Sequence, residues 1–121
     1  MKRIDIEDLK GKKFKTVKQN DEMIIFTDDE REYRLEHCQD CCEDVHVSEI
    51  IGNLTDLLDS EILMAEVVEE EMDGDGLLIW TFYKFATQKG YVTIIWRGES
   101  NGYYGVSVDI FQRKIKKGKN E

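Results

Sequence analysis

The sequence predicts an α+β fold, in which an antiparallel sheet of about six or seven strands carries one or two helices packed on one side. Residues 80–111 are rich in aromatic and β-branched residues that alternate as in strands. Three shorter runs of strand-like character lie between residues 13 and 36. Residues 48–58 instead repeat isoleucine and leucine at the spacing of an amphipathic helix. The length of 121 residues fits a single domain over residues 1–121.

The beginning of the chain predicts a short helix followed by a three-stranded meander. Ile4–Lys10 has apolar residues and an early aspartate that suit a helix, and Gly11 ends it. The three strands are expected at Lys13–Lys18, Glu22–Thr27 and Arg31–Glu36, with polar turn residues between them.

The middle of the chain predicts one helix and one further strand. In Ser48–Leu58 the apolar residues lie at helical spacing, and Ser48 or Asn53 is the candidate N-cap. Glu61–Met72 fits either a helix or a strand. The strand is favoured because the DGDG turn that follows would lead it into a hairpin with Leu77–Ala86. This turn begins like a calcium loop but lacks the ligand spacing of an EF-hand.

The aromatic segment predicts a second meander. Its first two strands are expected at Trp80–Ala86 and Tyr91–Trp96, joined by a turn in which Gly90 can take positive φ. Asn101-Gly102 suits a tight hairpin turn, after which Tyr103–Phe111 would form the third strand. The charged end of the chain, Arg113–Glu121, is expected to be a solvated tail, and the alternative is that its first residues extend the last strand and point a cation at a neighbour.

The net charge of −9 is distributed unevenly along the chain. Residues 1–20 carry a net charge of +4, residues 21–75 carry −18, and residues 76–121 carry +5. An acidic chain repels nucleic-acid polymers, but a small anion can still bind where the basic segments fold together. The charge pattern therefore argues against a nucleic-acid partner and is compatible with a compact phosphate ligand.

One short stretch contains all three cysteines and both histidines. Cys38 and Cys41 with His37 or His46 are zinc-ligand types, but no second cysteine pair is present to close a structural site. A catalytic cysteine is disfavoured because the neighbouring carboxylates oppose formation of a thiolate. We therefore expect Cys38, Cys41 and Cys42 to be small buried residues that close a loop against the sheet. We predict neither a bound metal nor a cofactor.

The apolar residues show no targeting pattern. No run of about 18 apolar residues predicts a membrane span, and the first residues lack the apolar core of a signal peptide. The odd number of cysteines argues against a disulfide framework. We therefore expect a cytoplasmic protein with no membrane partner.

The candidate ligand-binding residues lie in and after the aromatic segment. Aromatic faces can stack a base, cations can bind phosphates, and amide or hydroxyl groups can reach ribose oxygens. Packing in the core is the alternative for each ring, because most strand aromatics serve that purpose. The predicted ligand-binding residues are Trp80, Phe82, Lys84, Trp96, Arg97, Ser100, Asn101, Tyr103, Tyr104 and Arg113.

Three strings of residues carry a resemblance to a known family. HCQDCCEDV begins at His37, NLTDL begins at Asn53, and WTFYKFATQKGYVTIIWRGESNGYY begins at Trp80. Over roughly residues 37–109, the chain resembles a family of small acidic proteins common in bacteriophage genomes. It is similar to the phage sponge proteins that defeat the Thoeris defence system. The basic N-terminal strands and the tail lie outside the resemblance.

The resemblance implies binding rather than chemistry. Such sponge proteins sequester, without cleaving it, a cyclic ADP-ribose isomer made by TIR-domain enzymes, and some relatives hold other cyclic nucleotide signals. They form symmetric oligomers with pockets at subunit interfaces. The resemblance therefore implies a dimer or a dimer-based homo-oligomer in the host cytoplasm during infection. It assigns no binding residues position by position, but the predicted aromatics would stack the adenine and the cations would meet the pyrophosphate.

Two other functions are compatible with the sequence. A small nucleotide hydrolase would use Asp40, Glu43 or His37, although the chain offers no convincing catalytic constellation. A protein-interaction module would use the acidic surface of residues 21–75 to imitate nucleic acid. We favour a protein that is not an enzyme and that sequesters a nucleotide-derived signal.

Overall fold

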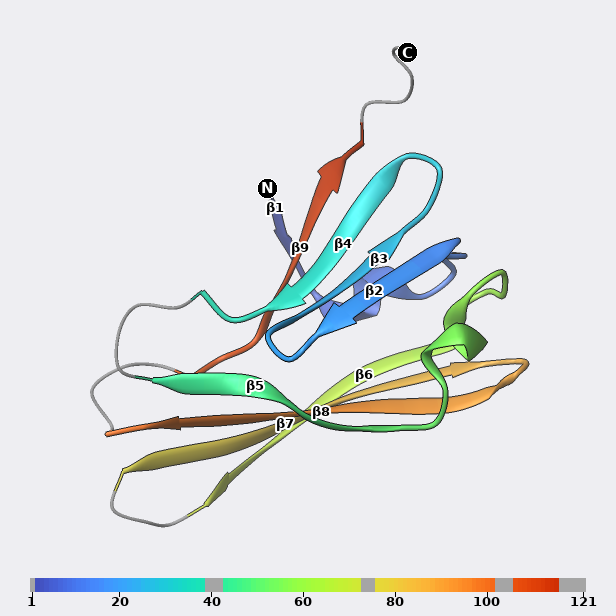
Figure 1. Ribbon diagram of the computed structural model, residues 1–121. Coiled ribbons are helices and arrows are strands. Elements are labelled where there is room, and N and C mark those ends of the chain that lie inside the picture. Colours follow the sequence, from blue (N-terminus) through green and yellow to red (C-terminus); the bar gives the residue numbers. More distant parts are fainter. Residues whose placement is uncertain (1, 39–42, 73–75, 102–105, 116–121) are drawn as a thin grey trace.

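Two antiparallel β-sheets pack face to face across one hydrophobic core (Figure 1). The computed structural model describes residues 2–38, 43–72, 76–101 and 106–115. The strand order is β1-β9-β4-β3-β2 in the five-stranded sheet and β5-β8-β7-β6 in the four-stranded sheet. No helix within the described ranges has the length and apolar character needed to cross a membrane.

Nine strands of the described residues form the two sheets. The five-stranded sheet consists of β1 (Lys2–Ile4), β2 (Thr16–Asn20), β3 (Met23–Thr27), β4 (Arg31–Glu36) and β9 (Asp109–Lys114). The four-stranded sheet consists of β5 (Asp44–Ile51), β6 (Met64–Met72), β7 (Leu77–Thr87) and β8 (Gly90–Ser100). Two single-turn 3₁₀ helices complete the described elements, namely η1 (Ile6–Leu9) and η2 (Leu54–Leu57).

Large aromatic side chains from both sheets fill the core. Phe26 and Tyr33 face inward from the five-stranded sheet, whereas Phe85 and Trp96 face inward from the four-stranded sheet, and all four are fully buried. Phe14 packs between them, with its ring centroid 4.8 Å from that of Phe26 in a stacked geometry. Alternate residues of β3, β4, β7 and β8 thus supply much of the core, and the residues between them face outward.

The predicted α+β class is wrong, because the described residues contain no α-helix packed on a sheet. Residues 48–58, predicted to be a helix, instead complete β5 and continue into η2. The pairing of β5 with β8 shifts between Val47 and Glu49, so that Val47 and Ile50 both pack on the core. This irregularity breaks the period of two and places the core-facing Val47 and Ile50 three residues apart, while Leu54 and Leu57 are buried from η2. The predicted helix at 4–10 is likewise reduced to the single turn of η1.

Both predicted meanders are confirmed in their early strands. β2, β3 and β4 pair consecutively, and β4 has the predicted bounds. The strand favoured for Glu61–Met72 is β6, which pairs with β7, and Gly90 has the expected positive φ in the β7–β8 turn. Asn53 caps η2, since its side chain accepts a hydrogen bond from the Thr55 N–H at 3.0 Å.

The prediction that Tyr103–Phe111 forms the third strand of the aromatic meander is wrong. β9 begins at Asp109, and it pairs with β1 and β4 in the opposite sheet rather than with β8. The segment before it contributes Val106 and Val108 to the core between the sheets. Gly102, in the predicted hairpin turn, lies outside the described residues, as do residues 73–75 of the DGDG turn.

Candidate functional site

Four of the predicted ligand-binding residues share the outer face of the four-stranded sheet. Side chains alternate along β7, and the odd-numbered residues 81–85 are buried in the core. Trp80, Phe82 and Lys84 therefore point away from the core and remain partly exposed. Arg97 belongs to the same face because it is the cross-strand partner of Trp80 in the pairing of β7 with β8.

A cation lies over an aromatic ring on this face. The guanidinium carbon of Arg97 is 5.9 Å from the centroid of the Trp80 ring, within the range of a cation–π interaction. Arg97 also donates a hydrogen bond of 3.2 Å to Glu99, whose side chain is exposed. Such an exposed ion pair contributes little to stability. Arg97 thus lies between the Trp80 ring and the Glu99 carboxylate, and Glu70 is the cross-strand partner of Trp80 on β6.

Apolar neighbours extend the platform across three strands. Val68 of β6 and Ile95 of β8 are the cross-strand partners of Phe82. Ile95 is only 8% exposed although it does not belong to the core between the sheets. Val68 remains 41% exposed at the edge of the sheet. We call Trp80, Phe82, Lys84 and Arg97 with these two neighbours the outer platform.

The structure does not bring the remaining predicted residues to the outer platform. Trp96 is fully buried and faces the core, so it cannot stack a ligand there. Ser100 is also buried, on the inward side of β8. Asn101 follows the end of β8 and is exposed. Tyr103 and Tyr104 lie outside the described residues.

Arg113 lies in the opposite sheet and has a local partner. Its guanidinium is 3.3 Å from Glu32 of β4, which also accepts a hydrogen bond from Arg34. Burial raises the pKa of the Glu32 carboxyl, but its hydrogen bonds and charge interactions with Arg34 and Arg113 outweigh that effect, so the net pKa is lowered. Arg113 therefore belongs to a charge network on the far side of the sandwich.

His37 and Glu43, two of the candidate hydrolase residues, form a buried pair. The Nε2 atom of His37 lies 2.8 Å from Oε2 of Glu43, and their side chains are 8% and 0% exposed. The Nδ1 atom lies 2.7 Å from the carbonyl oxygen of Ser107, which can only accept, so Nδ1 carries a proton. His37 thereby ties the β4–β5 connection to the β8–β9 connection. This closed geometry indicates a structural role, while Asp40 lies outside the described residues.

The cysteine prediction is wrong for the one cysteine that the structure describes. Cys38 is exposed rather than buried, and Cys41 and Cys42 lie outside the described residues. Among the described side chains, no three His, Cys, Asp or Glu residues are grouped closely enough to hold a metal ion. His46 instead contacts Asp44 at 3.0 Å on the surface of β5.

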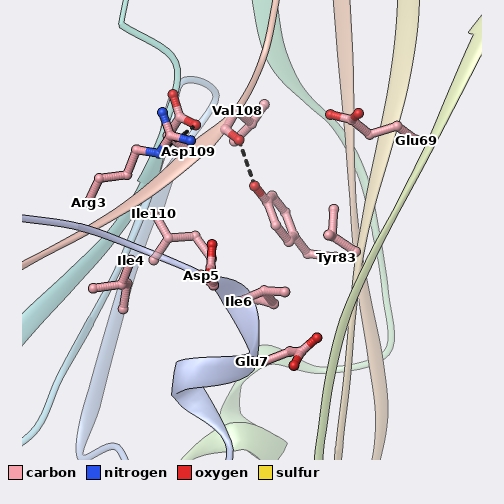
Figure 2. A pocket seen from close by; sticks show the side chains of 11 residues that line it. Arg3, Ile4, Asp5, Ile6, Glu7, Glu69, Tyr83, Val108, Asp109 and Ile110 are labelled. Atoms are coloured by element: carbon pink, nitrogen blue, oxygen red, sulfur yellow. Dashed lines mark hydrogen bonds and ion pairs between the residues drawn. The ribbon is translucent and has the colours of Figure 1, made fainter.

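A cleft that the sequence did not indicate opens between the sheets beside β6 (Figure 2). Its volume is about 350 Å³, and its walls come from β1, η1, β6, β7 and the start of β9. Tyr83 donates a 2.8 Å hydrogen bond to the carbonyl oxygen of Val108, as Figure 2 shows. Burial raises the pKa of Tyr83 well above its usual range, and the charges of Asp109 and Glu69 add to that effect.

The charge of this cleft has the wrong sign for phosphate. Asp5, Glu7, Glu69 and Asp109 line it, whereas Arg3 is the one cation among its described lining residues and lies 3.7 Å from Asp109. The cleft could not be predicted from the sequence because its walls come from both ends of the chain and from the middle of the chain. No local pattern predicts that residues so far apart will meet.

Comparison with known proteins identifies a family. No curated protein and no solved structure matches the chain. The model of a domain of unknown function, DUF7448, matches residues 7–110, which span β2 to β8 and the start of β9. Because this match covers most of the chain, the protein belongs to the DUF7448 family.

Proposed function

We propose that this protein binds and sequesters a nucleotide-derived signal without cleaving it. The observation that carries the proposal is the outer platform, where Arg97 lies over Trp80 beside Phe82 and Lys84. An aromatic face can stack a base, and Arg97 beside that face can engage a phosphate, whereas Lys84 lies opposite Thr93, further along the same face.

The resemblance of residues 37–109 to phage sponge proteins supports the identity of the signal. We propose a cyclic ADP-ribose isomer made by TIR-domain immune enzymes, with other cyclic nucleotide signals as further ligands. Such a protein would act as a phage anti-defence factor in the cytoplasm of the infected cell. Sequestration requires affinity and slow release but no catalytic group.

We also propose that the protein works as a homo-oligomer. An open sheet face covers only one side of a bound ligand, whereas small-molecule sites normally bury most of the ligand surface. A second copy related by a twofold axis would place its own platform opposite the first and enclose the ligand.

The Trp80→Ala variant is expected to weaken binding of a cyclic ADP-ribose isomer by about tenfold or more, because stacking of a base on an aromatic ring contributes about 1–3 kcal/mol. Isothermal titration calorimetry with the purified isomer measures this change. Trp80→Phe retains a ring and is expected to lose less. Arg113→Ala is the matched control, since it removes a predicted cation on the opposite sheet, and it is expected to change affinity by less than about twofold. Equal losses in Trp80→Ala and Arg113→Ala would exclude the outer platform as the site.

One observation favours a second function, a protein-interaction module with an acidic surface. β6 is an edge strand, and Glu66, Glu69, Glu70 and Glu71 are all exposed along it. Such a strand can attract a basic protein partner. Tight binding to a basic partner that salt abolishes, with no small-molecule ligand, would favour this function over sequestration.

A further inference from the structure

The two basic ends of the chain lie side by side in the five-stranded sheet (Figure 1). β1 pairs with β9, with Lys2 opposite Gln112, and β9 pairs with β4, with Arg31 opposite Lys114. The charge pattern of the sequence is compatible with a small anion bound where the basic segments fold together. The structure places these segments next to each other and adds Arg31 from the otherwise acidic middle of the chain.

A pocket of about 470 Å³ lies beside these strands and is lined by four cations, namely Lys2, Arg3, Lys12 and Arg31. Strand alternation places Lys2 and Arg31 on the core-facing side of the five-stranded sheet, because Ile4 and Tyr33 two residues further along face the core. Gln112 lies on the same side for the same reason and adds an amide group. The Nζ atom of Lys12 lies 5.5 Å from the centroid of the Tyr33 ring.

Most of this positive charge is not engaged in a direct ion pair, although two carboxylates also line the pocket. Within the described part of the chain, Lys2, Lys12 and Arg31 make no ion pair, whereas Arg3 pairs with Asp109. Like charges directly opposite each other on neighbouring strands are destabilising, and Arg31 faces Lys114 in this way. An anion bound beside Arg31 would offset part of that repulsion, although Lys114 itself does not line the pocket.

Two carboxylates limit the kind of anion that fits. Asp5 and Asp8 also line the pocket, and Asp8 accepts a 3.1 Å hydrogen bond from the backbone N–H of Asp5 at the start of η1. These carboxylates, together with the net charge of −9, repel an extended polyanion. A compact anion that contacts only the cationic side of the pocket avoids most of this repulsion.

We propose that this pocket binds a compact polyphosphate group, with pyrophosphate as its simplest form. Arg31 can engage two phosphate oxygens through its planar fork, while Lys2 and Lys12 act as point charges. Gln112 can donate through its amide. This site is distinct from the outer platform, because it lies on the five-stranded sheet rather than on the outer face of the four-stranded sheet.

Calorimetric titration with inorganic pyrophosphate at low ionic strength tests the proposal. The wild-type protein is expected to bind it, and Arg31→Ala and Lys12→Met are each expected to weaken binding about tenfold. The methionine keeps an apolar chain over Tyr33 and removes only the charge. Lys18→Ala is the matched control, since it removes an exposed cation of β2 that does not line the pocket, and it should leave affinity unchanged. Thermal melts of each variant establish that it is folded.

Two results would overturn the site. One is no measurable binding of pyrophosphate by the folded wild-type protein. The other is an equal loss of affinity in Lys18→Ala and Arg31→Ala. That result would indicate that the overall positive charge of the surface attracts pyrophosphate and that the pocket does not bind it specifically. Arg97→Ala removes a cation of the outer platform that does not line this pocket, so loss of pyrophosphate binding in Arg31→Ala but not in Arg97→Ala assigns the anion to the pocket and keeps the two sites separable.

Discussion

The His37→Ala variant is expected to lose about 3 kcal/mol of unfolding free energy. The variant removes the imidazole that contacts the fully buried carboxyl group of Glu43. The carboxyl group stays inside the protein, where the loss of a polar contact costs free energy. It also removes the hydrogen bond to the Ser107 carbonyl, which links the two connections between the sheets. Urea denaturation followed by tryptophan fluorescence measures the loss.

The other histidine provides a matched control for this prediction. His46 makes a contact of similar length with Asp44, but their side chains are 33% and 68% exposed. His46→Ala is therefore expected to change stability by less than about 0.5 kcal/mol. The double variant His37→Leu with Glu43→Leu should recover much of the loss, since apolar residues can replace a buried pair. Equal effects of His37→Ala and His46→Ala would show that the buried pair does not stabilise the sandwich.

The Gly52→Ala variant is expected to lose about 3 kcal/mol of unfolding free energy. Gly52 follows β5 with a φ of +97°, which L-residues rarely adopt. A Cβ atom here would lie 2.5 Å from the carbonyl oxygen of Tyr91 and 3.3 Å from Cα of Val92. Both are backbone atoms of β8, so relief requires the chain itself to move.

Gly11→Ala is the control that measures the free-energy cost of the positive φ without the steric clash expected at Gly52. Gly11 has a similar φ of +85°, but a Cβ atom there would meet nothing within 4 Å. We expect Gly11→Ala to cost about 1 kcal/mol, from the left-handed conformation alone. Chemical denaturation of both variants measures the difference, and equal costs would contradict the close approach of Gly52 to β8.

Local patterns predicted most of the strands but not how the sheets assemble. The meander of β2, β3 and β4 follows from alternation and polar turns, as do β6, β7 and β8. The prediction of a helix at 48–58 failed because an irregularity in β5 sets the core-facing Val47 and Ile50 three residues apart, and η2 then buries Leu54 and Leu57 at the same spacing. β9 could not be assigned to its sheet, because its partners β1 and β4 are remote in sequence. Long-range pairing of this kind leaves no local signal.

Alternation also determines how far the site could be predicted. Side chains two residues apart in a strand lie on the same face of the sheet. The sequence therefore predicts that Trp80, Phe82 and Lys84 share a face, as the structure shows. Trp96 and Arg97 are adjacent, so only one of them can reach that face, and the structure places Arg97 there. Arg113 could not be excluded from sequence, because its location depends on the sheet to which β9 belongs.

The measurement that tests sequestration most directly is mass spectrometry of what the protein releases. The purified protein is incubated with the product mixture of an activated TIR-domain enzyme, freed of unbound material by filtration, and heated. Release of an intact cyclic ADP-ribose isomer is the result that we predict, and Trp80→Ala should release much less of it. A cleaved product would mean that the protein is an enzyme, and the absence of any released nucleotide would contradict sequestration and favour the acidic surface of β6.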